Sequence, residues 1–343
     1  MAKKAVILFN LGGPDSPEAV EPFLFNLFND PAILRVPQPL RWLLAKLISR
    51  RRAPLAKGIY AELGGASPIV PETVAQAHAL TDVLNEAGGD SYRVFIAMRY
   101  WHPFAKETVR QVKEWQADEV ILLPLYPQFS TTTTASSFLD WSRAAKAAGL
   151  SVPTRAICCY PEEPGFIEAE AALIAPILQR MEGKPVRLLF SAHGLPQKIV
   201  DAGDPYQKQV ERSVAAVVAR LGAPALDWRL SYQSRVGPLK WLEPATDAEI
   251  IRAGKEGVCV IIVPIAFVSE HSETLVELDI EYGKLARDSG VPDYYRIPTV
   301  SVEDAFIRGL ARMVVELSAP ARAPGEEIFF AADNPCDCMT LAS

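Results

Sequence analysis

The chain has 343 residues, of which 49% are hydrophobic, which is enough for two domains of ordinary size that each bury a core. Its formal net charge of −6 argues against a nucleic-acid partner, because proteins that bind nucleic acids usually present a basic surface. No apolar run reaches the roughly 18 residues that a membrane-spanning helix needs. The five cysteines are an odd number, so a disulfide framework is not expected.

The N-terminus carries no clear targeting pattern. Met-Ala-Lys-Lys leads directly into the apolar run Ala5–Leu11, which is at the short end for a signal segment, and Asn10–Pro14 does not resemble a cleavage site. We therefore expect a first strand here and a cytoplasmic protein.

Strands and helices alternate along the chain, which predicts an α/β fold with mainly parallel sheets. Strands are expected near 4–11, 92–99, 118–125, 153–159, 186–191, 226–233, 258–265 and 293–297. Helices are expected near 17–29, 71–87, 103–116, 164–181, 205–221, 246–255, 270–288 and 302–317. Two similar halves with a cleft between them are the simplest architecture. We place an N-terminal domain at 1–155, a C-terminal domain at 156–320 and a loosely held, Ala- and Pro-rich tail at 321–343.

Residues 36–54 depart from the pattern of alternating strands and helices. An apolar helix face is followed at once by the basic run Arg50–Arg52. The face consists of Leu40, Leu43, Leu44, Leu47 and Ile48, beside Trp42. An apolar face with a cationic end suits a membrane surface, or an apolar ligand that bears carboxylates. A helix packed on its own domain remains the alternative.

An acidic helix follows the most apolar strand of the second half. The run Val258–Ile265 predicts a buried strand, and Ser269 is a candidate N-cap for the helix after it. Glu273, Glu277 and Glu281 then recur at a spacing of four, which places them on one helix face. Like charges at this spacing repel, and a cation would relieve the repulsion. The alternative is an ordinary solvated face.

Loops at the ends of four predicted strands combine aromatic, cationic and hydroxyl groups. These loops are Arg99–Pro103, Tyr126–Thr134, Ser191–Pro196 and Tyr232–Trp241. Because ligands usually bind at the carboxyl ends of parallel strands, the loops predict a pocket for a large, flat, partly anionic molecule. His193 should face this pocket, although a histidine at such a place is as often structural as catalytic. Asn10–Pro14 lacks the spacing of a dinucleotide fingerprint, and no dense zinc-ligand pattern occurs.

The same loops resemble the ferrochelatase family, whose members insert ferrous iron into protoporphyrin IX to make protoheme, the terminal step of heme biosynthesis. The matching stretches are Asn10–Pro14, Gly64–Ile69, Arg99–Pro103, Tyr126–Ser137, Ser191–Pro196, Gly203–Tyr206, Tyr232–Trp241 and Pro264–Tyr282. The resemblance covers most of the chain, and the pairing of Ser191–Pro196 with Pro264–Tyr282 is highly specific. It implies a lyase built from two Rossmann-like, doubly wound parallel-sheet domains around a porphyrin cleft.

The resemblance also implies roles for individual residues. His193 matches the active-site histidine and Glu273 the acid that faces it, and a neutral imidazole is a suitable proton acceptor. His193, Glu273, Glu277 and Glu281 are the expected iron ligands or carriers. The expected substrate contacts are Leu11, Arg52, Arg99, Tyr100, Tyr126, Ser234, Trp241 and Phe267, with Arg52 and Ser234 holding the propionates.

Two departures from the family pattern concern the propionates and a possible cluster. Leu55 stands where animal members carry a propionate-holding lysine, which leaves Lys57 as a candidate replacement. Some members bind a [2Fe–2S] cluster through four cysteines, and this chain has Thr131 at one of the animal positions. The cysteines left for such a set are Cys158, Cys159, Cys336 and Cys338. We expect no cofactor beyond Fe²⁺ as a substrate, with the cluster as the open alternative.

Two other functions stay open at this point. A related chelatase would act on coproporphyrin or sirohydrochlorin, whereas a non-catalytic tetrapyrrole carrier would need neither a base nor an iron path. The pairing of His193 with Glu273 argues against the carrier. The expected partners are protoporphyrin IX and ferrous iron, with peripheral association on the inner face of the membrane. The protein is expected to be a monomer or a homodimer.

Overall fold

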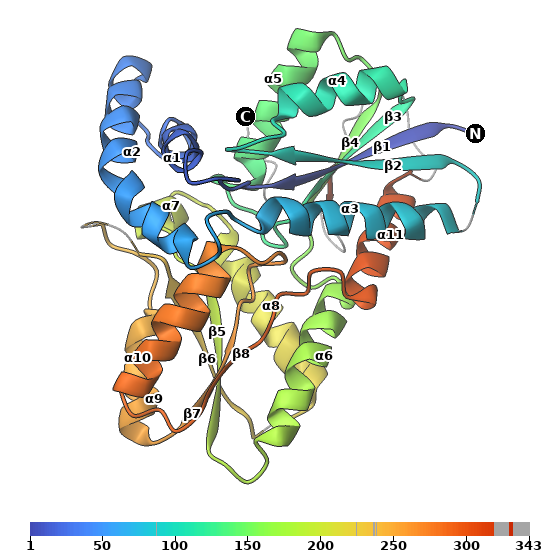
Figure 1. The fold of residues 1–343 in the computed structure, drawn as a ribbon. Coiled ribbons are helices and arrows are strands. Elements are labelled where there is room, and N and C mark those ends of the chain that lie inside the picture. Colours follow the sequence, from blue (N-terminus) through green and yellow to red (C-terminus); the bar gives the residue numbers. More distant parts are fainter. Residues whose placement is uncertain (87, 224, 236, 238, 319–328, 332–343) are drawn as a thin grey trace. The chain divides into compact units, whose positions relative to one another are not determined.

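The computed structural model describes residues 1–86, 88–223, 225–235, 237, 239–318 and 329–331. The chain forms two compact units (Figure 1). Unit 1 comprises Met1–Cys159 together with the C-terminal segment from Ala311, and unit 2 comprises Tyr160–Leu310. The α/β class predicted from the sequence is confirmed, since each unit holds a parallel sheet flanked by helices. The cleft expected between the two halves stays a prediction.

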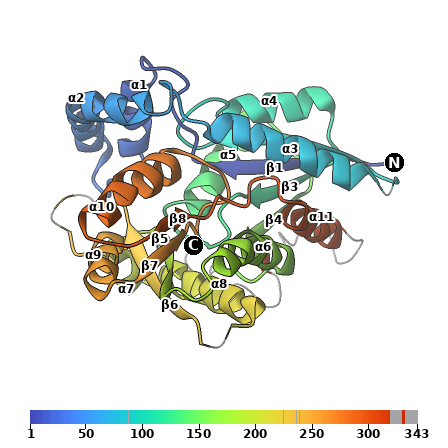
Figure 2. The ribbon, with the colours of Figure 1, turned by 60° about the horizontal axis from the view of Figure 1, so that its bottom comes forward.

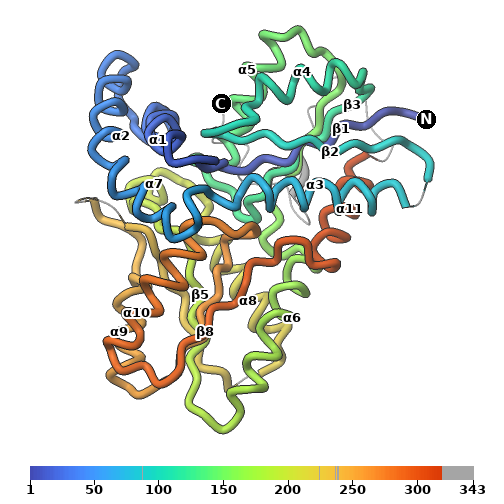
Figure 3. Tube along the Cα trace, viewed as in Figure 1, coloured from blue at the N-terminus to red at the C-terminus, as the bar shows by residue number. Residues whose placement is uncertain are grey.

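Unit 1 is built on a parallel sheet with the strand order β2-β1-β3-β4-β9. Its strands are β1 (Lys3–Asn10), β2 (Ser91–Met98), β3 (Glu119–Pro124), β4 (Thr154–Cys159) and β9 (Phe329–Ala331). Alternate residues of β1, namely Ala5, Ile7 and Phe9, pack against α4 (Ala105–Trp115) and α5 (Thr134–Ala148). These helices cover one face of the sheet, and α3 (Ile69–Glu86) lies on the other (Figures 1 and 3).

Two further helices of unit 1, α1 (Val20–Phe28) and α2 (Gln38–Ala61), pack against each other. Val20 and Phe23 of α1 and Ala53 and Tyr60 of α2 share a small core with Tyr100. The apolar face predicted within 36–54 therefore lies on a real helix, which runs beyond the predicted segment and contains Pro54.

Unit 2 contains a parallel sheet with the order β6-β5-β7-β8. Its strands are β5 (Val186–His193), β6 (Asp227–Gln233), β7 (Cys259–Val263) and β8 (Tyr294–Arg296). One face is covered by α9 (Thr246–Glu256) and α10 (Tyr282–Asp288), and the other by α6 (Pro164–Arg180) and α8 (Tyr206–Leu221), as Figure 2 shows. The short helix α7 spans Gln197–Asp201. Between β7 and α10 lies a π-helix, η1 (Glu273–Glu281).

The division of the chain differs from the predicted segments 1–155 and 156–320 at the C-terminal end. The last helix, α11 (Asp304–Ser318), crosses from unit 2 into unit 1 after Leu310. Its C-terminal end is held by unit 1, where Lys4 donates to the Ser318 carbonyl and Arg155 donates to the Leu317 carbonyl. Most of the predicted tail, 321–343, lies outside the described residues. Its described part, β9, pairs with β4.

Two helices differ from the sequence prediction for local reasons. The run Thr131–Thr134 looked like a loop because of its hydroxyl groups, yet it leads into α5. The helix predicted from residue 270 instead begins at Glu273, with Ser272 rather than Ser269 as its N-cap. Ser269 is used differently, because its carbonyl accepts a hydrogen bond from the His271 ring.

Glu170, on α6, has no recorded hydrogen-bond partner for either carboxylate oxygen among the described residues, and it is fully buried. Burial raises the pKa of its carboxyl group to about 8, far above the value near 4.3 of an unfolded chain. The folded protein therefore holds this proton more tightly than the unfolded chain, so Glu170 reduces stability progressively as pH rises from about 4.3 to 8.

We predict that Glu170→Gln makes unit 2 more stable at pH 8 and leaves it nearly unchanged near pH 3.5, where the Glu170 side chain is neutral in the folded and in the unfolded state. Thermal melts from pH 3.5 to 8 should show a gap that grows with pH to roughly 10 °C. Glu168→Gln, an exposed neighbour on the same helix, serves as the control and should show no such trend. A pH-independent gap would contradict a neutral, buried Glu170.

Candidate active site

His193 is the last residue of β5, and it lies in register with Gln233, the last residue of β6. Both residues are therefore at the carboxyl ends of neighbouring parallel strands, where open α/β sheets bind ligands. The backbone carbonyl of His193 accepts a hydrogen bond of 3.0 Å from the Tyr206 hydroxyl at the start of α8. The histidine is thus fixed at its backbone, while 39% of its side chain remains accessible.

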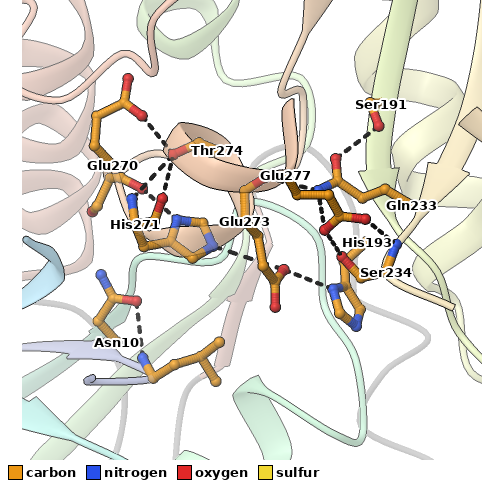
Figure 4. Close-up of polar contacts among 12 residues, drawn as sticks. Asn10, Ser191, His193, Gln233, Ser234, Glu270, His271, Glu273, Thr274 and Glu277 are labelled. Atoms are coloured by element: carbon orange, nitrogen blue, oxygen red, sulfur yellow. Dashed lines mark hydrogen bonds and ion pairs between the residues drawn. The ribbon is translucent and has the colours of Figure 1, made fainter. Parts of the chain in front are cut away.

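The side chain of His193 is paired with Glu273, the first residue of η1. The distance from His193 Nδ1 to Glu273 Oε2 is 2.8 Å (Figure 4). Because a carboxylate oxygen accepts, Nδ1 carries the proton, and Nε2 of the neutral ring is left as an acceptor. Partial burial opposes a charge on the ring, but the Glu273 carboxylate outweighs it and raises the pKa of His193 above 6.5. The pair can therefore take up a proton at Nε2 and hold it.

Glu273 also lies near a second histidine, His271, which the sequence analysis did not include among the site residues. His271 is buried, and its Nδ1 donates to the Ser269 carbonyl at 3.0 Å. Its Nε2 is therefore turned toward Glu273 Oε2, at 3.8 Å. Burial would raise the pKa of Glu273, but His193 and His271 lower it, so the carboxyl group is ionised. In the sequence, the only indication that His271 lies in this cluster was its position two residues before Glu273.

The Glu277 carboxylate accepts hydrogen bonds from four donors. Its Oε1 accepts from the Ser234 backbone N–H at 2.8 Å and from the Tyr282 hydroxyl at 3.1 Å. Its Oε2 accepts from the Ser234 hydroxyl at 2.5 Å and from the Gln233 amide at 3.1 Å. Burial and the neighbouring Glu273 raise the pKa of Glu277, while the Ser234 donors oppose that shift. In this structure the Ser234 hydroxyl, which was expected to hold a propionate, binds Glu277 within its own unit.

Glu281 does not join this cluster. It is the last residue of η1, it is exposed, and it has no recorded hydrogen bond or ion pair among the described residues. The three glutamates were expected to share one face of a helix, and in the structure Glu273 and Glu277 take part in the polar cluster while Glu281 is exposed. The described part of the chain contains no group of three or more His, Cys, Asp or Glu side chains arranged to hold a metal ion.

An ion-pair network connects the segment just before η1 and the C-terminal half of η1 to the end of β8. Arg296 contacts Glu270 Oε1 through Nη1 at 2.8 Å, and Asp279 Oδ2 through Nε at 2.8 Å. Glu270 also accepts from the Thr274 hydroxyl at 2.5 Å and the Thr299 backbone N–H at 3.0 Å. Burial alone would raise the pKa of Glu270, but Arg296 and these donors lower it.

The expected substrate contacts Arg99 and Tyr100 have a structural role inside unit 1. Arg99 Nη2 lies 2.7 Å from Asp30 Oδ2, and the buried Tyr100 hydroxyl donates to the same oxygen at 2.9 Å. Ser136 at the start of α5 donates to it as well, at 2.6 Å. This buried carboxylate ties the end of β2, the segment after α1 and the start of α5 together. The contacts of Arg99 and Tyr100 with substrate stay a prediction.

The other expected contact residues are placed as follows, each within its own unit. Tyr126 is buried in the core of unit 1, and Leu11 is partly buried beside it. Arg52 lies over the Phe28 ring at 5.9 Å, whereas Leu55 and Lys57 are exposed. In unit 2, Trp241 is partly buried, and the Phe267 ring lies 4.9 Å from that of His271.

Of the cysteines expected for a cluster, Cys158 and Cys159 are buried in β4, and their sulfur atoms are 3.7 Å apart, too far for a disulfide. Cys336 and Cys338 lie outside the described residues.

Comparison with known proteins gives a consistent result. The family model Ferrochelatase matches residues 3–317. The chain is 57% identical to "Ferrochelatase" of Phenylobacterium zucineum, over 98% of each chain. It is 54% identical to "Ferrochelatase" of Caulobacter vibrioides, over 94% of this chain and 92% of the relative. Among solved structures, SirB from Bacillus subtilis with Fe³⁺ is 12% identical with a TM-score of 0.56, over 93% of this chain and 96% of that one, which supports the fold alone.

The Arg296 network yields a stability prediction. Replacing Arg296 with Met should destabilise the protein by about 3 kcal/mol, because it leaves the mostly buried Glu270 carboxylate without its cation. Since the pKa of Glu270 is depressed in the folded state, its stabilising contribution exists above the unfolded value near 4.3 and is lost at lower pH. The deficit of the variant should therefore shrink on acidification.

Urea unfolding at pH 7 and pH 4 would measure this deficit. Lys284→Met is the matched control, since its pair with Asp288 is exposed and should contribute less than about 1 kcal/mol. Equal losses in the two variants would contradict the assignment of Arg296 as the cation that holds η1.

Proposed function

The chain belongs to the ferrochelatase family, and we propose that His193 and Glu273 carry out its reaction, the insertion of Fe²⁺ into protoporphyrin IX to form protoheme. The reaction removes two protons from pyrrole nitrogens and strips water from the metal. Because Glu273 holds the Nδ1 proton of His193, the free Nε2 is the group that accepts a pyrrole proton. The 2.8 Å contact between these two side chains is the observation that carries the assignment.

The proton balance follows from the same contact. A pyrrole N–H gives its proton to Nε2, and the imidazolium is stabilised by the ionised Glu273. His193 is partly accessible, so the proton passes to water and the ring is neutral again for the second N–H. Fe²⁺ takes the place of the two protons, and the product is protoheme with two protons released to solvent.

For the metal, we assign different tasks to the four expected ligands. Glu273 and His193 act nearest the macrocycle, and His271 Nε2 adds a nitrogen ligand beside Glu273. Glu277 already accepts four hydrogen bonds, so it contributes a fixed negative charge more readily than a free ligand. Glu281 is exposed, which suits the first attraction of a hydrated cation.

For the porphyrin, we propose apolar contacts from Leu11, Tyr126, Trp241 and Phe267, with Arg52 as a partner of a propionate. Aromatic and aliphatic side chains suit the flat faces of a macrocycle, and a guanidinium suits a carboxylate. Arg99 and Ser234 are bound to Asp30 and Glu277, so we assign them to positioning these carboxylates. No cofactor is required by this scheme, in which iron is a substrate.

His193→Ala should retain porphyrin binding and lose most of the insertion activity, by about 100-fold or more, since it removes the proton acceptor. Glu273→Gln should also lower kcat strongly, because it removes the charge that stabilises the imidazolium. Glu281→Gln should act mainly on the apparent KM for Fe²⁺. His102→Ala, at an exposed histidine paired with Glu107, is the control and should keep full activity.

The decisive measurement is an absorbance titration with protoporphyrin under anaerobic conditions, with and without Fe²⁺, repeated with coproporphyrin and sirohydrochlorin. Metallation of protoporphyrin alone supports the proposed substrate, and preference for another tetrapyrrole would replace it. Binding without metallation would identify a carrier. Near-full turnover by His193→Ala would contradict the assignment of His193 as the proton acceptor.

We also propose that α2 attaches the protein to the inner surface of the membrane. Leu40, Trp42, Leu43 and Leu47 each expose about half of their surface, so α2 gathers four large exposed apolar side chains within two turns or so of helix. Arg50 and Arg51 are exposed on the same helix and favour anionic lipid. In the described residues no helix is long and apolar enough to cross a bilayer, so the attachment we propose is peripheral.

Sedimentation with anionic liposomes tests this attachment. Binding should be strong at low salt and weaken as salt screens the arginines. Leu43→Glu should reduce it at least several-fold, whereas Leu139→Glu, a similarly exposed leucine on α5, should not. Absence of binding at low salt would refute the proposal.

A further inference from the structure

Gln233 occupies a place in the site that the reaction scheme does not use. It is 1% exposed at the end of β6, beside His193. Its amide nitrogen donates to the Glu273 backbone carbonyl at 3.0 Å and to Glu277 Oε2 at 3.1 Å. Its amide oxygen accepts from the Ser191 hydroxyl at 2.7 Å (Figure 4). The Gln233 side chain thus contacts Glu273, the first residue of η1, and Glu277, which lies about one turn further along.

The orientation of this amide is determined by its partners. The Glu273 carbonyl is an acceptor only, so the NH₂ group and not the oxygen must face it. The opposite orientation would place the amide oxygen against that carbonyl and the Glu277 carboxylate. The amide oxygen therefore faces Ser191, and Ser191 must donate its single hydroxyl proton to it.

A chain of buried hydroxyl groups supports this arrangement. Ser191 Oγ is 3.0 Å from Thr246 Oγ1, which is 2.9 Å from Ser231 Oγ. The Ser191 proton is used for Gln233, and Ser231 donates its proton to the Phe190 carbonyl at 3.1 Å, so Thr246 donates to one of these two serine hydroxyls. All three residues are 0% exposed. Buried polar groups are tolerated when every member is satisfied, and a satisfied network specifies one geometry.

A strained backbone lies directly beside the amide. Ser234, the next residue, has φ of 61°, in the left-handed region that a non-glycine residue rarely adopts. Such a conformation costs about 1–2 kcal/mol and persists where the surrounding structure over-determines it. Here it directs both the N–H and the hydroxyl of Ser234 at Glu277.

From this juxtaposition we propose that Gln233, oriented by Ser191 and by its two acceptors on Glu273 and Glu277, is a positioning residue that ties the first turn of η1 and the Glu277 carboxylate to the end of β6. It keeps Glu273 in contact with His193 and acts through these residues without touching substrate. The proposal rests on the roles given above to His193 and Glu273.

The experiment compares Gln233→Met, which keeps the side-chain length and removes the polar atoms, with Ser191→Ala, which removes only the donor to the amide. Ser213→Ala is the matched control, because this α8 serine is equally buried and donates to Pro161 and Gln209, away from the cluster. Two readouts are used: kcat and KM for protoporphyrin metallation, and hydrogen exchange of the η1 amides in the substrate-free protein.

For Gln233→Met we expect kcat to fall about tenfold with the porphyrin KM within about twofold, since one charge-assisted hydrogen bond and the geometry it sets are lost. Exchange of the η1 amides should accelerate about tenfold. Ser191→Ala should give about a threefold effect on both readouts, because the acceptors still orient the amide. Ser213→Ala should change neither readout.

Unchanged kcat and exchange in a folded Gln233→Met would overturn the proposal, as would equal effects in Ser213→Ala. If Gln233→Met does not fold, the comparison of Ser191→Ala with Ser213→Ala decides. Faster hydrogen exchange in Gln233→Met would support the positioning of η1 by Gln233. If His193→Ala were fully active at the same time, the catalytic roles proposed for His193 and Glu273 would be refuted instead.

Discussion

The contact between His193 and Glu273 is the constraint on which the rest of the site depends. It joins the end of a strand to the first residue of a helix that lies 80 positions later in the chain. Two neighbouring interactions hold the backbones of the two partners. Tyr206 holds the backbone of His193, while Gln233 holds the backbone of Glu273. Because Nδ1 donates to Glu273, the contact also defines the tautomer of the neutral His193 ring.

The row of three glutamates, Glu273, Glu277 and Glu281, is stabilised by neighbouring protein groups and by solvent exposure. Three like charges on one helix would repel one another in isolation. In the protein, Glu273 is balanced by two histidines, Glu277 by four hydrogen-bond donors, and Glu281 by water. The repulsion is therefore relieved at each position separately, which allows the row to exist before any metal arrives.

Patterns of hydrophobicity predicted the fold well, because the buried strands β1, β5 and β7 are β-branched or apolar runs with turns at their ends. The carboxyl-end loops of these strands also indicated His193 and Glu273, which the structure brings into contact, while their catalytic roles stay a prediction. What sequence could not supply is the choice among partners. Arg99 and Ser234 have the chemistry of ligand groups, yet each is bound to a carboxylate of its own unit, Asp30 or Glu277. Such pairings depend on tertiary geometry, which residue type and spacing alone do not predict.

The π-helix η1 is a second feature that could not be predicted from the sequence, in this case a backbone conformation. A spacing of four residues was interpreted with the geometry of an α-helix, the common case. In the π-helix η1, Glu277 accepts from Gln233 at the end of β6 and from Tyr282, five residues further along, while Glu281 is exposed. Such a helix is uncommon because its backbone geometry is unfavourable, so it needs anchors along its length. Arg296 provides one through Glu270 and Asp279, and Gln233 provides another through the Glu273 carbonyl. The polar groups around η1 therefore maintain the uncommon backbone that presents Glu273 to His193.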